Sequence, residues 1–358
     1  MIKAYKNKKI LVGICDIGNG HINRQICVIN KFLNEGAHVI VATTKEKENI
    51  IKDIFPDLIV IQINIPWITC TCNGLNYKDC LDKYKSKKID QYKNFFEFAL
   101  LVEKHFGSKP DFVISDYEPN VAQYAYSSMI PLICMEQQSK FIYLNDIEIE
   151  NSSIKEERYR LNYFFPKFEK KIISSFFPIS INDEKVLIVP PIISKFDCKF
   201  KDIKKVVVYF SPYSNSEKYE KILNAIKDIQ DYNFHVYTEN SYTKFQHYKN
   251  IKISSFNNMF KDDLASSSFL LSTAGHQLLS EAIYLDIPIY VFPLETYEQK
   301  YNALMIEKYK LGYIAKDLSN AEIICFLSQY DAFYKNIREF KDTYYKTSWE
   351  EEIEKLLD

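Results

Sequence analysis

The sequence predicts an α/β protein of two domains, each built around a doubly wound parallel sheet. The chain has 358 residues, about the length of two ordinary domains. Strand-like and helix-like segments alternate along it, which is typical of parallel sheets with helices on both faces. The alternation stops near Ser139 and restarts after Pro190 and Pro191. We therefore expect one domain over residues 1–190 and a second over residues 191–339.

The first half begins with an apolar strand over residues 10–15, followed by a glycine-containing loop. An amphipathic helix then runs to Gly36, a residue that suits the C-terminus of a helix. Further strands are expected over residues 38–43, 58–65, 111–115 and 130–135. Segment 139–190 is rich in aromatic residues and lysine, and it is expected to interrupt this pattern.

The second half repeats the design. Strands are expected over residues 206–210, 234–237, 251–254, 269–272 and 287–292, with a helix over residues 216–229. A helical stretch over residues 333–357 closes the chain, and its last part, about 340–358, is expected to cross back to the first domain. Open parallel sheets bind ligands at the carboxyl ends of their strands, so two such domains facing each other would form a central binding cleft.

Composition excludes several classes of protein. The 46 Lys and Arg residues balance 47 Asp and Glu residues, so no basic field would attract nucleic acid. The 47% of apolar residues is enough for a real core, which excludes disorder. No apolar run is long enough to span a membrane. The 8 cysteines are scattered without a Cys-x-x-Cys pair, which favours reduced thiols and a cytoplasmic location.

The loop after the first strand carries Gly18 and Gly20 and suggests a phosphate-binding helix N-terminus. It does not complete the dinucleotide fingerprint. Asn23 stands where that pattern has its third glycine, and the second strand ends at Thr44 without an acidic residue. A nicotinamide-dependent dehydrogenase is therefore disfavoured.

His21 lies at this strand-to-helix turn, where an imidazole could accept a proton from a substrate. Asp116 follows another apolar strand and could hydrogen-bond the ring and stabilise its charged form. Glu118 is a weaker alternative partner. In the ordinary interpretation, His21 caps the helix or is a chance exposed histidine, and Asp116 caps the next helix.

The second domain contains the most informative stretch, residues 272–282. A strand ends at Ser272, a turn follows at Gly275, and the next helix presents free amides that would suit a diphosphate. Glu281 could accept hydrogen bonds from the two vicinal hydroxyls of a ribose. Glu298, Gln299 and Asn302 could contact sugar hydroxyls. The alternative is an ordinary strand, turn and helix with Glu281 on a solvated face.

These stretches resemble the nucleotide-sugar signature of GT-B glycosyltransferases. The likeness is to the families of the bacterial peptidoglycan N-acetylglucosaminyltransferase and of the UDP-glucuronosyl and UDP-glucosyl transferases. Segments 18–24, 32–43, 272–282 and 298–303 carry it, in the same order along the chain. The Asp-x-Glu-Pro sequence at residues 116–119 resembles a less characterised branch. The resemblance implies a GT-B fold and transfer of a sugar from a nucleotide-sugar.

The resemblance also assigns roles. His21 corresponds to the catalytic base and Asp116 to its carboxylate partner. The donor-binding residues it implies are Gly18, Gly20, Thr273, Gly275, His276, Gln277, Glu281, Glu298, Gln299 and Asn302. The chain departs from the plant-type signature in carrying Thr273 in place of a phosphate-contacting histidine and Leu278 in place of a serine. His276 stands where related enzymes carry an aromatic or small residue, so it either reaches the phosphate or packs.

The expected reaction is a metal-independent, inverting transfer from a UDP-sugar to an acceptor hydroxyl, with no other cofactor. The chain has no Asp-x-Asp metal motif, so helix amides would neutralise the diphosphate. The acceptor would be a carbohydrate or a lipid-linked molecule. Segment 158–178 could meet it, stack on a sugar, touch a membrane surface peripherally, or form ordinary core. A non-hydrolysing UDP-sugar epimerase and a non-catalytic nucleotide-sugar-binding subunit are the alternative functions.

Overall fold

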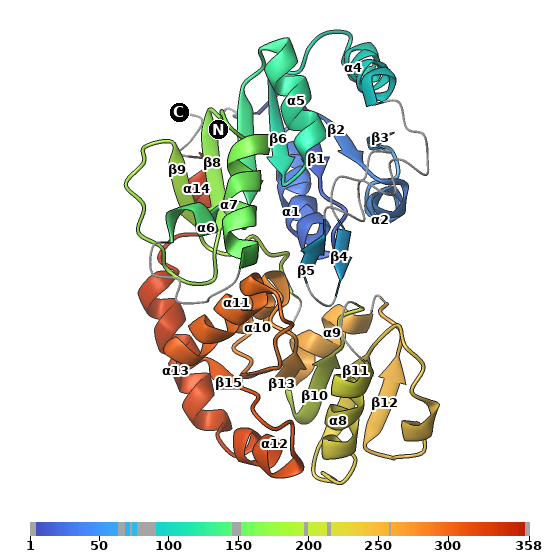
Figure 1. Ribbon diagram of the computed structural model, residues 1–358, viewed down its shortest axis with the longest axis vertical. Coiled ribbons are helices and arrows are strands. Elements are labelled where there is room, and N and C mark those ends of the chain that lie inside the picture. Colours follow the sequence, from blue (N-terminus) through green and yellow to red (C-terminus); the bar gives the residue numbers. More distant parts are fainter. Residues whose placement is uncertain are drawn as a thin grey trace. The chain divides into compact units, whose positions relative to one another are not determined.

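The computed structural model describes residues 5–63, 69–71, 74–76, 91–144, 152–196, 200–212, 216–257 and 259–354. The chain divides into two compact units, each with its own parallel sheet (Figure 1). The first unit contains residues 1–69, 75–194 and 347–358, and the second contains residues 70–74 and 195–346. A separate two-stranded sheet pairs β4 (Thr69–Thr71) with β5 (Gly74–Asn76).

The first unit has a seven-stranded parallel sheet in the order β3-β2-β1-β6-β7-β8-β9. Its strands are β1 (Lys9–Ile14), β2 (His38–Thr43), β3 (Ile59–Gln62), β6 (Phe112–Asp116), β7 (Leu132–Glu136), β8 (Lys170–Ser174) and β9 (Val186–Val189). The chain reverses its direction of growth between β1 and β6. In such sheets, ligands bind where the strand order reverses, outside the carboxyl ends of the strands.

Helices cover both faces of this sheet because alternate side chains of its strands point in opposite directions. Ile10 of β1 packs in one apolar cluster with Ile22 of α1, and Leu11 packs in another with Val121 of α5. At Gly13, a Cβ atom would lie 2.3 Å from Val121, so glycine allows α5 to approach β1 closely. The helices of this unit are α1 (Gly20–Asn34), α2 (Lys45–Ile54), α4 (Gln91–Phe106), α5 (Pro119–Ser128), α6 (Lys140–Tyr143), α7 (Ser152–Phe164) and α14 (Trp349–Glu354).

Segment 139–190 was expected to interrupt the pattern, and this expectation is wrong. It supplies α6, α7, β8 and β9, and both strands join the sheet in parallel. β8 begins with Lys170 and Lys171, and two consecutive lysines do not form the apolar pattern by which a buried strand is recognised in a sequence. Lys171 is nevertheless only 2% exposed, and its ammonium group lies 4.3 Å from the centre of the Phe168 ring. A cation–π contact and a buried alkyl stem thus let a lysine occupy a strand position in the core.

The second unit repeats the strand order of the first, as β12-β11-β10-β13-β14-β15. Its strands are β10 (Asp202–Tyr209), β11 (Asn233–Tyr237), β12 (Ile251–Ser254), β13 (Ser267–Ser272), β14 (Ile289–Val291) and β15 (Gly312–Ile314). Its helices are α8 (Ser216–Ile226), α9 (Met259–Ser266), α10 (His276–Tyr284), α11 (Tyr297–Lys308), α12 (Asn320–Leu327) and α13 (Tyr330–Tyr344), with a 3₁₀ turn at Thr243–Phe245. Here the order reverses between β10 and β13, so the loop after β13 lies where sheets of this kind bind their ligands.

The C-terminal stretch is two helices and not one. α13 ends at Tyr344 and α14 begins at Trp349. Trp349 and Ile353 lie in the apolar core of the first unit. Glu354 forms an ion pair with Lys31 of α1, with its Oε1 atom 2.6 Å from Lys31 Nζ. The end of the described chain therefore packs as part of the N-terminal unit.

Candidate active site

The loop between β1 and α1 turns at Gly18, whose φ of +62° lies in the left-handed region that favours glycine. α1 then begins at Gly20. The residue before it, Asn19, does not cap the helix, because its side-chain oxygen accepts a 2.8 Å hydrogen bond from Lys47. The first amides of α1 are thus left without a side-chain cap, as an anion site requires.

The structure brings His21 and Asp116 together. His21 is the second residue of α1, and Asp116 is the last residue of β6. They meet because β1 and β6 are neighbours in register, with Ile14 opposite Asp116. The His21 Nδ1 atom lies 2.7 Å from Asp116 Oδ1, and both side chains are buried. A carboxylate only accepts, so Nδ1 carries the hydrogen and Nε2 keeps the basic lone pair.

Two further residues of α1 hold Asp116, and sequence analysis did not assign them to the site. Arg24 donates to both carboxylate oxygens, from Nε at 2.9 Å and from Nη2 at 2.7 Å. Gln25 donates to Oδ2 at 2.8 Å and also to the carbonyl of Met135. Helix periodicity was the available signal, because residues three and four positions after His21 share its face of the helix.

This arrangement keeps Asp116 ionised. Complete burial raises the pKa of a carboxyl, but the Arg24 guanidinium and the His21 ring outweigh burial and hold the pKa of Asp116 below its ordinary value. The carboxylate can therefore fix the tautomer of His21 and stabilise its imidazolium form.

Glu118 serves the next helix and not His21. It is the N-cap of α5, where its Oε2 accepts a 2.8 Å hydrogen bond from the amide of Val121. Its Oε1 accepts a 2.6 Å bond from the side chain of Asn120. Burial raises the pKa of Glu118 to about 7. The capping role that was one interpretation of Asp116 thus belongs to Glu118.

Arg24 Nη2 also lies 3.3 Å from His21 Nδ1, and two further described side chains contact the ring. Tyr117 lies parallel to it, with the planes at 11° and the ring centres 6.0 Å apart. Its backbone has a φ of +56°, and its hydroxyl donates to Glu157 of α7. Gln138, in the loop after β7, places its amide nitrogen 3.3 Å from His21 Nε2. Neither residue was predicted. Tyr117 directly follows Asp116 in the chain, whereas the position of Gln138 depends on the strand order, in which β7 pairs with β6.

In the second unit, residues 273–275 join β13 to α10. Thr273 and His276 are both 2% exposed, so they lie mainly inside the fold. Gly275 is the N-cap of α10 and has an ordinary φ of −69°. A Cβ atom there would meet nothing within 4 Å. Neither backbone torsion nor packing requires this glycine, and its small size leaves open space over the first turn of α10.

Glu281 lies further along α10 and is 4% exposed, so it does not lie on a solvated face. Its Oε1 accepts a 3.2 Å hydrogen bond from Gln277, one helical turn earlier. Burial raises the pKa of Glu281 to about 7, although the bond from Gln277 lowers it in part. Glu281 is therefore a buried carboxyl group that is only partly ionised near neutral pH.

The remaining predicted donor residues lie on α11. Gln299 ties two loops together, because its Oε1 accepts hydrogen bonds from the amides of Ala274 and Leu294, both at 3.0 Å. Asn302 is fully buried and donates to the carbonyl of Ala274 at 2.9 Å. Glu298 lies half-buried in the first turn. Gln299 and Asn302 thus support the loop before Gly275 from within the fold.

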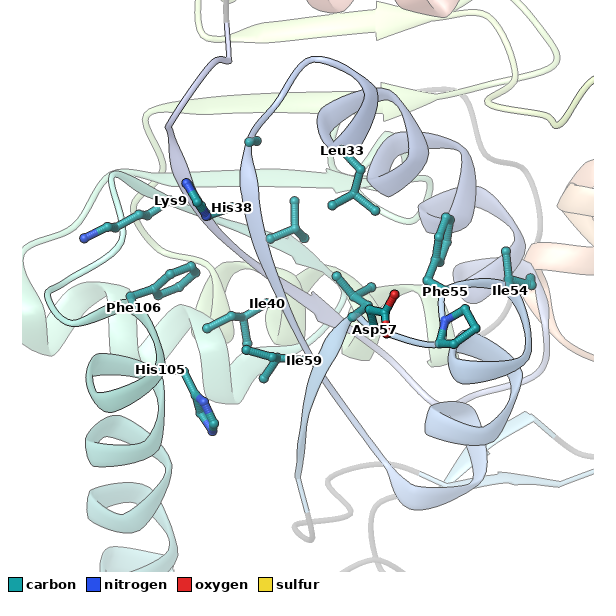
Figure 2. Close-up of a pocket in the computed structure, with 14 residues that line it drawn as sticks. Lys9, Leu33, His38, Ile40, Ile54, Phe55, Asp57, Ile59, His105 and Phe106 are labelled. Carbon is teal, nitrogen blue, oxygen red and sulfur yellow. The ribbon is translucent and has the colours of Figure 1, made fainter.

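A cavity of about 600 Å³ lies at the other edge of the first sheet (Figure 2). Lys9, His38 and Ile59 line it, and they are the first residues of β1, β2 and β3. Phe55 and Phe106 add apolar surface. Because the strands are parallel, this edge is opposite the one that carries His21 and Asp116. The cavity therefore does not belong to the candidate site.

Within the described ranges, no three His, Cys, Asp or Glu side chains gather in a set that could hold a metal ion. No helix in the same ranges has both the length and the apolar character needed to cross a bilayer. Cys15, Cys27, Cys134 and Cys325 are free thiols. The side chains of Cys70, Cys72, Cys80 and Cys198 lie outside the described part of the chain.

Comparisons with known proteins agree with this architecture. A family model described as glycosyl transferase family 1 matches residues 8–330. No curated protein sequence matches the chain.

Several solved structures are similar across nearly the whole chain. One is UGT2 of Phytolacca americana, solved with UDP-2-fluoroglucose and pterostilbene, with a TM-score of 0.69, 12% identity and 94% coverage of both chains. A second is a UDP-glucosyltransferase of Polygonum tinctorium, with a TM-score of 0.70, 12% identity and coverage of 95% of this chain and 94% of that one. A third is the calicheamicin glycosyltransferase CalG4, with a TM-score of 0.63, 14% identity and 94% coverage of both. These likenesses confirm the predicted fold of two Rossmann-like domains, the GT-B fold.

Proposed function

The chain belongs to glycosyl transferase family 1 and is a glycosyltransferase, and from that premise we propose that it moves a sugar from a UDP-sugar to an acceptor hydroxyl with inversion. The hydrogen-bonded pair of His21 and Asp116 is the observation that carries this proposal. It leaves one basic nitrogen on a ring whose other nitrogen is held by an ionised carboxylate. Such a pair suits a general base.

His21 Nε2 takes the proton of the acceptor hydroxyl while that oxygen attacks the anomeric carbon of the donor. The bond from this carbon to the diphosphate breaks, and UDP leaves with the electron pair. Asp116 stabilises the imidazolium that forms, and Arg24 keeps Asp116 ionised through its two hydrogen bonds. A displacement in one step inverts the configuration at the anomeric carbon.

The second unit holds the donor in this proposal. The open space at Gly275 gives the diphosphate access to the first amides of α10, and these amides neutralise its charge without a metal ion. Glu281 accepts hydrogen bonds from the ribose hydroxyls. Thr273, His276, Gln277 and Glu298 stay predicted donor residues, as do Gly18 and Gly20 of the first loop. The Phytolacca enzyme was solved with a UDP-sugar, which supports a donor of this class.

The acceptor and the location stay predictions. A carbohydrate or lipid-linked acceptor would approach from the first unit, and the reaction requires the two domains to meet around the donor in the expected cleft. In segment 158–178, Phe176 and Phe177 are buried, whereas Tyr159 and Tyr163 are 74% and 65% exposed. These two tyrosines are the aromatic residues of that segment available for an acceptor or for peripheral contact with a cytoplasmic membrane face.

One set of incubations tests the function. The protein is incubated with UDP-glucose or UDP-N-acetylglucosamine, with and without methyl glucoside or 4-methylumbelliferone, and UDP and sugar products are measured. We expect acceptor-dependent release of UDP. In the His21→Ala variant, kcat should fall about 10²- to 10⁴-fold, the usual contribution of a general base, while UDP affinity is retained.

The control for this variant is His38→Ala, which changes an exposed histidine at the start of β2 and should behave like wild type. Near-normal turnover by His21→Ala would contradict the assignment of the base. Formation of an epimer of the donor would favour the epimerase alternative, and UDP binding without any product would favour a binding subunit.

A further inference from the structure

Among the described residues, Gln138 places its side chain against the basic nitrogen of His21. It lies in the loop after β7 and is 7% exposed. Its amide nitrogen is 3.3 Å from His21 Nε2, the nitrogen that is not bonded to Asp116. In the structure, this amide therefore lies where the hydroxyl of an acceptor would have to bind.

The hydrogen-bond partners fix which end of the Gln138 amide faces His21. Its oxygen accepts a 3.3 Å hydrogen bond from the backbone amide of Gln137. The NH₂ group therefore points to the ring, and one of its hydrogens is donated to the lone pair of Nε2. The whole chain of bonds is consistent, with Gln138 donating to Nε2 and Nδ1 donating to Asp116.

We propose that Gln138 caps the catalytic base in the empty site and then positions the acceptor hydroxyl. This inference rests on the proposed function of His21. A hydroxyl oxygen that gives its proton to Nε2 must lie about 2.8 Å from it, which is the space that the amide now fills. The amide therefore has to move aside, and from its new place its N–H donates to a lone pair of the acceptor oxygen.

This second hydrogen bond acts on the reaction itself. As the acceptor oxygen loses its proton to Nε2 and forms its bond to the anomeric carbon, negative charge develops on it. A donor aimed at that oxygen stabilises the charge and orients the attacking lone pair. A water molecule can also attack the donor. Other water molecules can donate to its oxygen in place of Gln138, so we expect hydrolysis to depend less on Gln138 than transfer does.

The test compares transfer with hydrolysis in the Gln138→Met variant. Methionine has a similar length but donates no hydrogen bond. With UDP-glucose and the acceptor that wild type uses, we expect transfer to fall about tenfold to hundredfold, the loss typical of one hydrogen bond to a developing charge. Hydrolysis of UDP-glucose without acceptor should stay the same or rise, because the base is no longer capped. The affinity for UDP, measured by calorimetry, should not change.

Gln137→Met is the matched control. Gln137 is also 7% exposed in the same loop, but its side-chain oxygen accepts from Lys140. This variant is expected to lose stability and to keep the wild-type ratio of transfer to hydrolysis. If Gln138→Met does not fold, Gln138→Leu replaces it, since leucine is also uncharged and donates no hydrogen bond.

Equal losses of transfer and hydrolysis in the Gln138 variant would show a merely structural residue and would overturn the inference. A wild-type ratio in that variant would overturn it as well. Both results leave the proposed function intact. Failure of the wild-type enzyme to transfer or hydrolyse any UDP-sugar is a separate result, and it removes the proposed function together with this inference.

Discussion

Each of the two units buries a carboxyl group near the loop that is proposed to bind a ligand, and the surroundings shift the pKa values of the two groups in opposite directions. Asp116 accepts four hydrogen bonds, from His21, Gln25 and both donor atoms of Arg24. Within the described residues, the Glu281 carboxyl accepts one side-chain hydrogen bond, at 3.2 Å from Gln277. Accordingly, the pKa of Asp116 is lowered below its ordinary value, whereas burial raises that of Glu281 to about 7.

Under the proposed function, the difference separates a group that assists the reaction, Asp116, from a group that binds a ligand, Glu281. A carboxylate that orients a base has to be charged and fixed before the substrate arrives, so the protein itself supplies its partners. A carboxylate that binds hydroxyl groups gains most when its partners come from the ligand. The following predictions change one of these two carboxyl groups or the loops beside them.

The largest effect is expected for Asp116→Asn. The amide cannot balance the charge of Arg24, which is 1% exposed, and an unpaired buried charge typically costs about 3–5 kcal/mol. The free energy of unfolding, measured with urea, should fall by about this amount. By contrast, Glu281→Gln at pH 8 should leave it unchanged or raise it, because no paired charge is lost.

A double variant tests whether the unpaired charge of Arg24 causes the loss of stability in Asp116→Asn. Replacing Arg24 by methionine in the Asp116→Asn background removes the unpaired cation, so part of the stability should return while transfer activity stays low. If the double variant is no more stable than Asp116→Asn, the buried charge of Arg24 does not explain the loss.

Some residues of the candidate site could be predicted from the sequence, and others could not. His21 and Asp116 both follow apolar strands that end in polar loops, so their place at the carboxyl edge could be inferred. Arg24 lies in segment 18–24, which also contains His21, but its pairing with Asp116 depends on which face of α1 turns toward β6. Gln138 could not be found, because the adjacency of β7 and β6 is a matter of strand order. Local patterns show where strands end, whereas the order in which they pair is a long-range property.

Segment 139–190 shows that local sequence patterns are limited in predicting the fold as well as the site. Its lysines and aromatic residues suggested an interruption of the strand and helix pattern, although Lys171 lies in the core over the ring of Phe168. Binary patterns count lysine as polar, and only the contact made by its alkyl stem and ammonium group explains the burial. Likewise, Asn302 was expected to meet the donor, and its hydrogen bond to Ala274 depends on how α11 packs under the loop.

An intermediate effect is expected from pH on donor binding. In the proposed function, ribose hydroxyls donate to the ionised form of Glu281, and burial raises the pKa of Glu281 to about 7. Binding must therefore release a proton at acidic pH, and affinity should rise by up to about tenfold between pH 6 and pH 8. UDP-glucose is the suitable probe for calorimetry, because its diphosphate has no terminal group that titrates in this range.

The Glu281→Gln variant is the control for this dependence, since an amide accepts hydrogen bonds without titrating. Its affinity for UDP-glucose should be lower at pH 8 and independent of pH over the same interval. A wild-type affinity that does not change with pH, or a dependence that persists in the variant, would mean that Glu281 does not bind the ribose.

The smallest effects are expected at the two glycines, where stability and binding should separate. Gly18 has a φ of +62°, so Gly18→Ala should cost about 1–2 kcal/mol of unfolding free energy. Gly275 has a φ of −69° and open space around it, so Gly275→Ala should change stability by less than about 0.5 kcal/mol. The added methyl group would nevertheless fill the space through which the diphosphate reaches α10, and affinity for UDP-glucose should fall a few-fold. Unchanged affinity in Gly275→Ala, with the expected loss of stability in Gly18→Ala, would show that the donor phosphates do not approach α10 at this point.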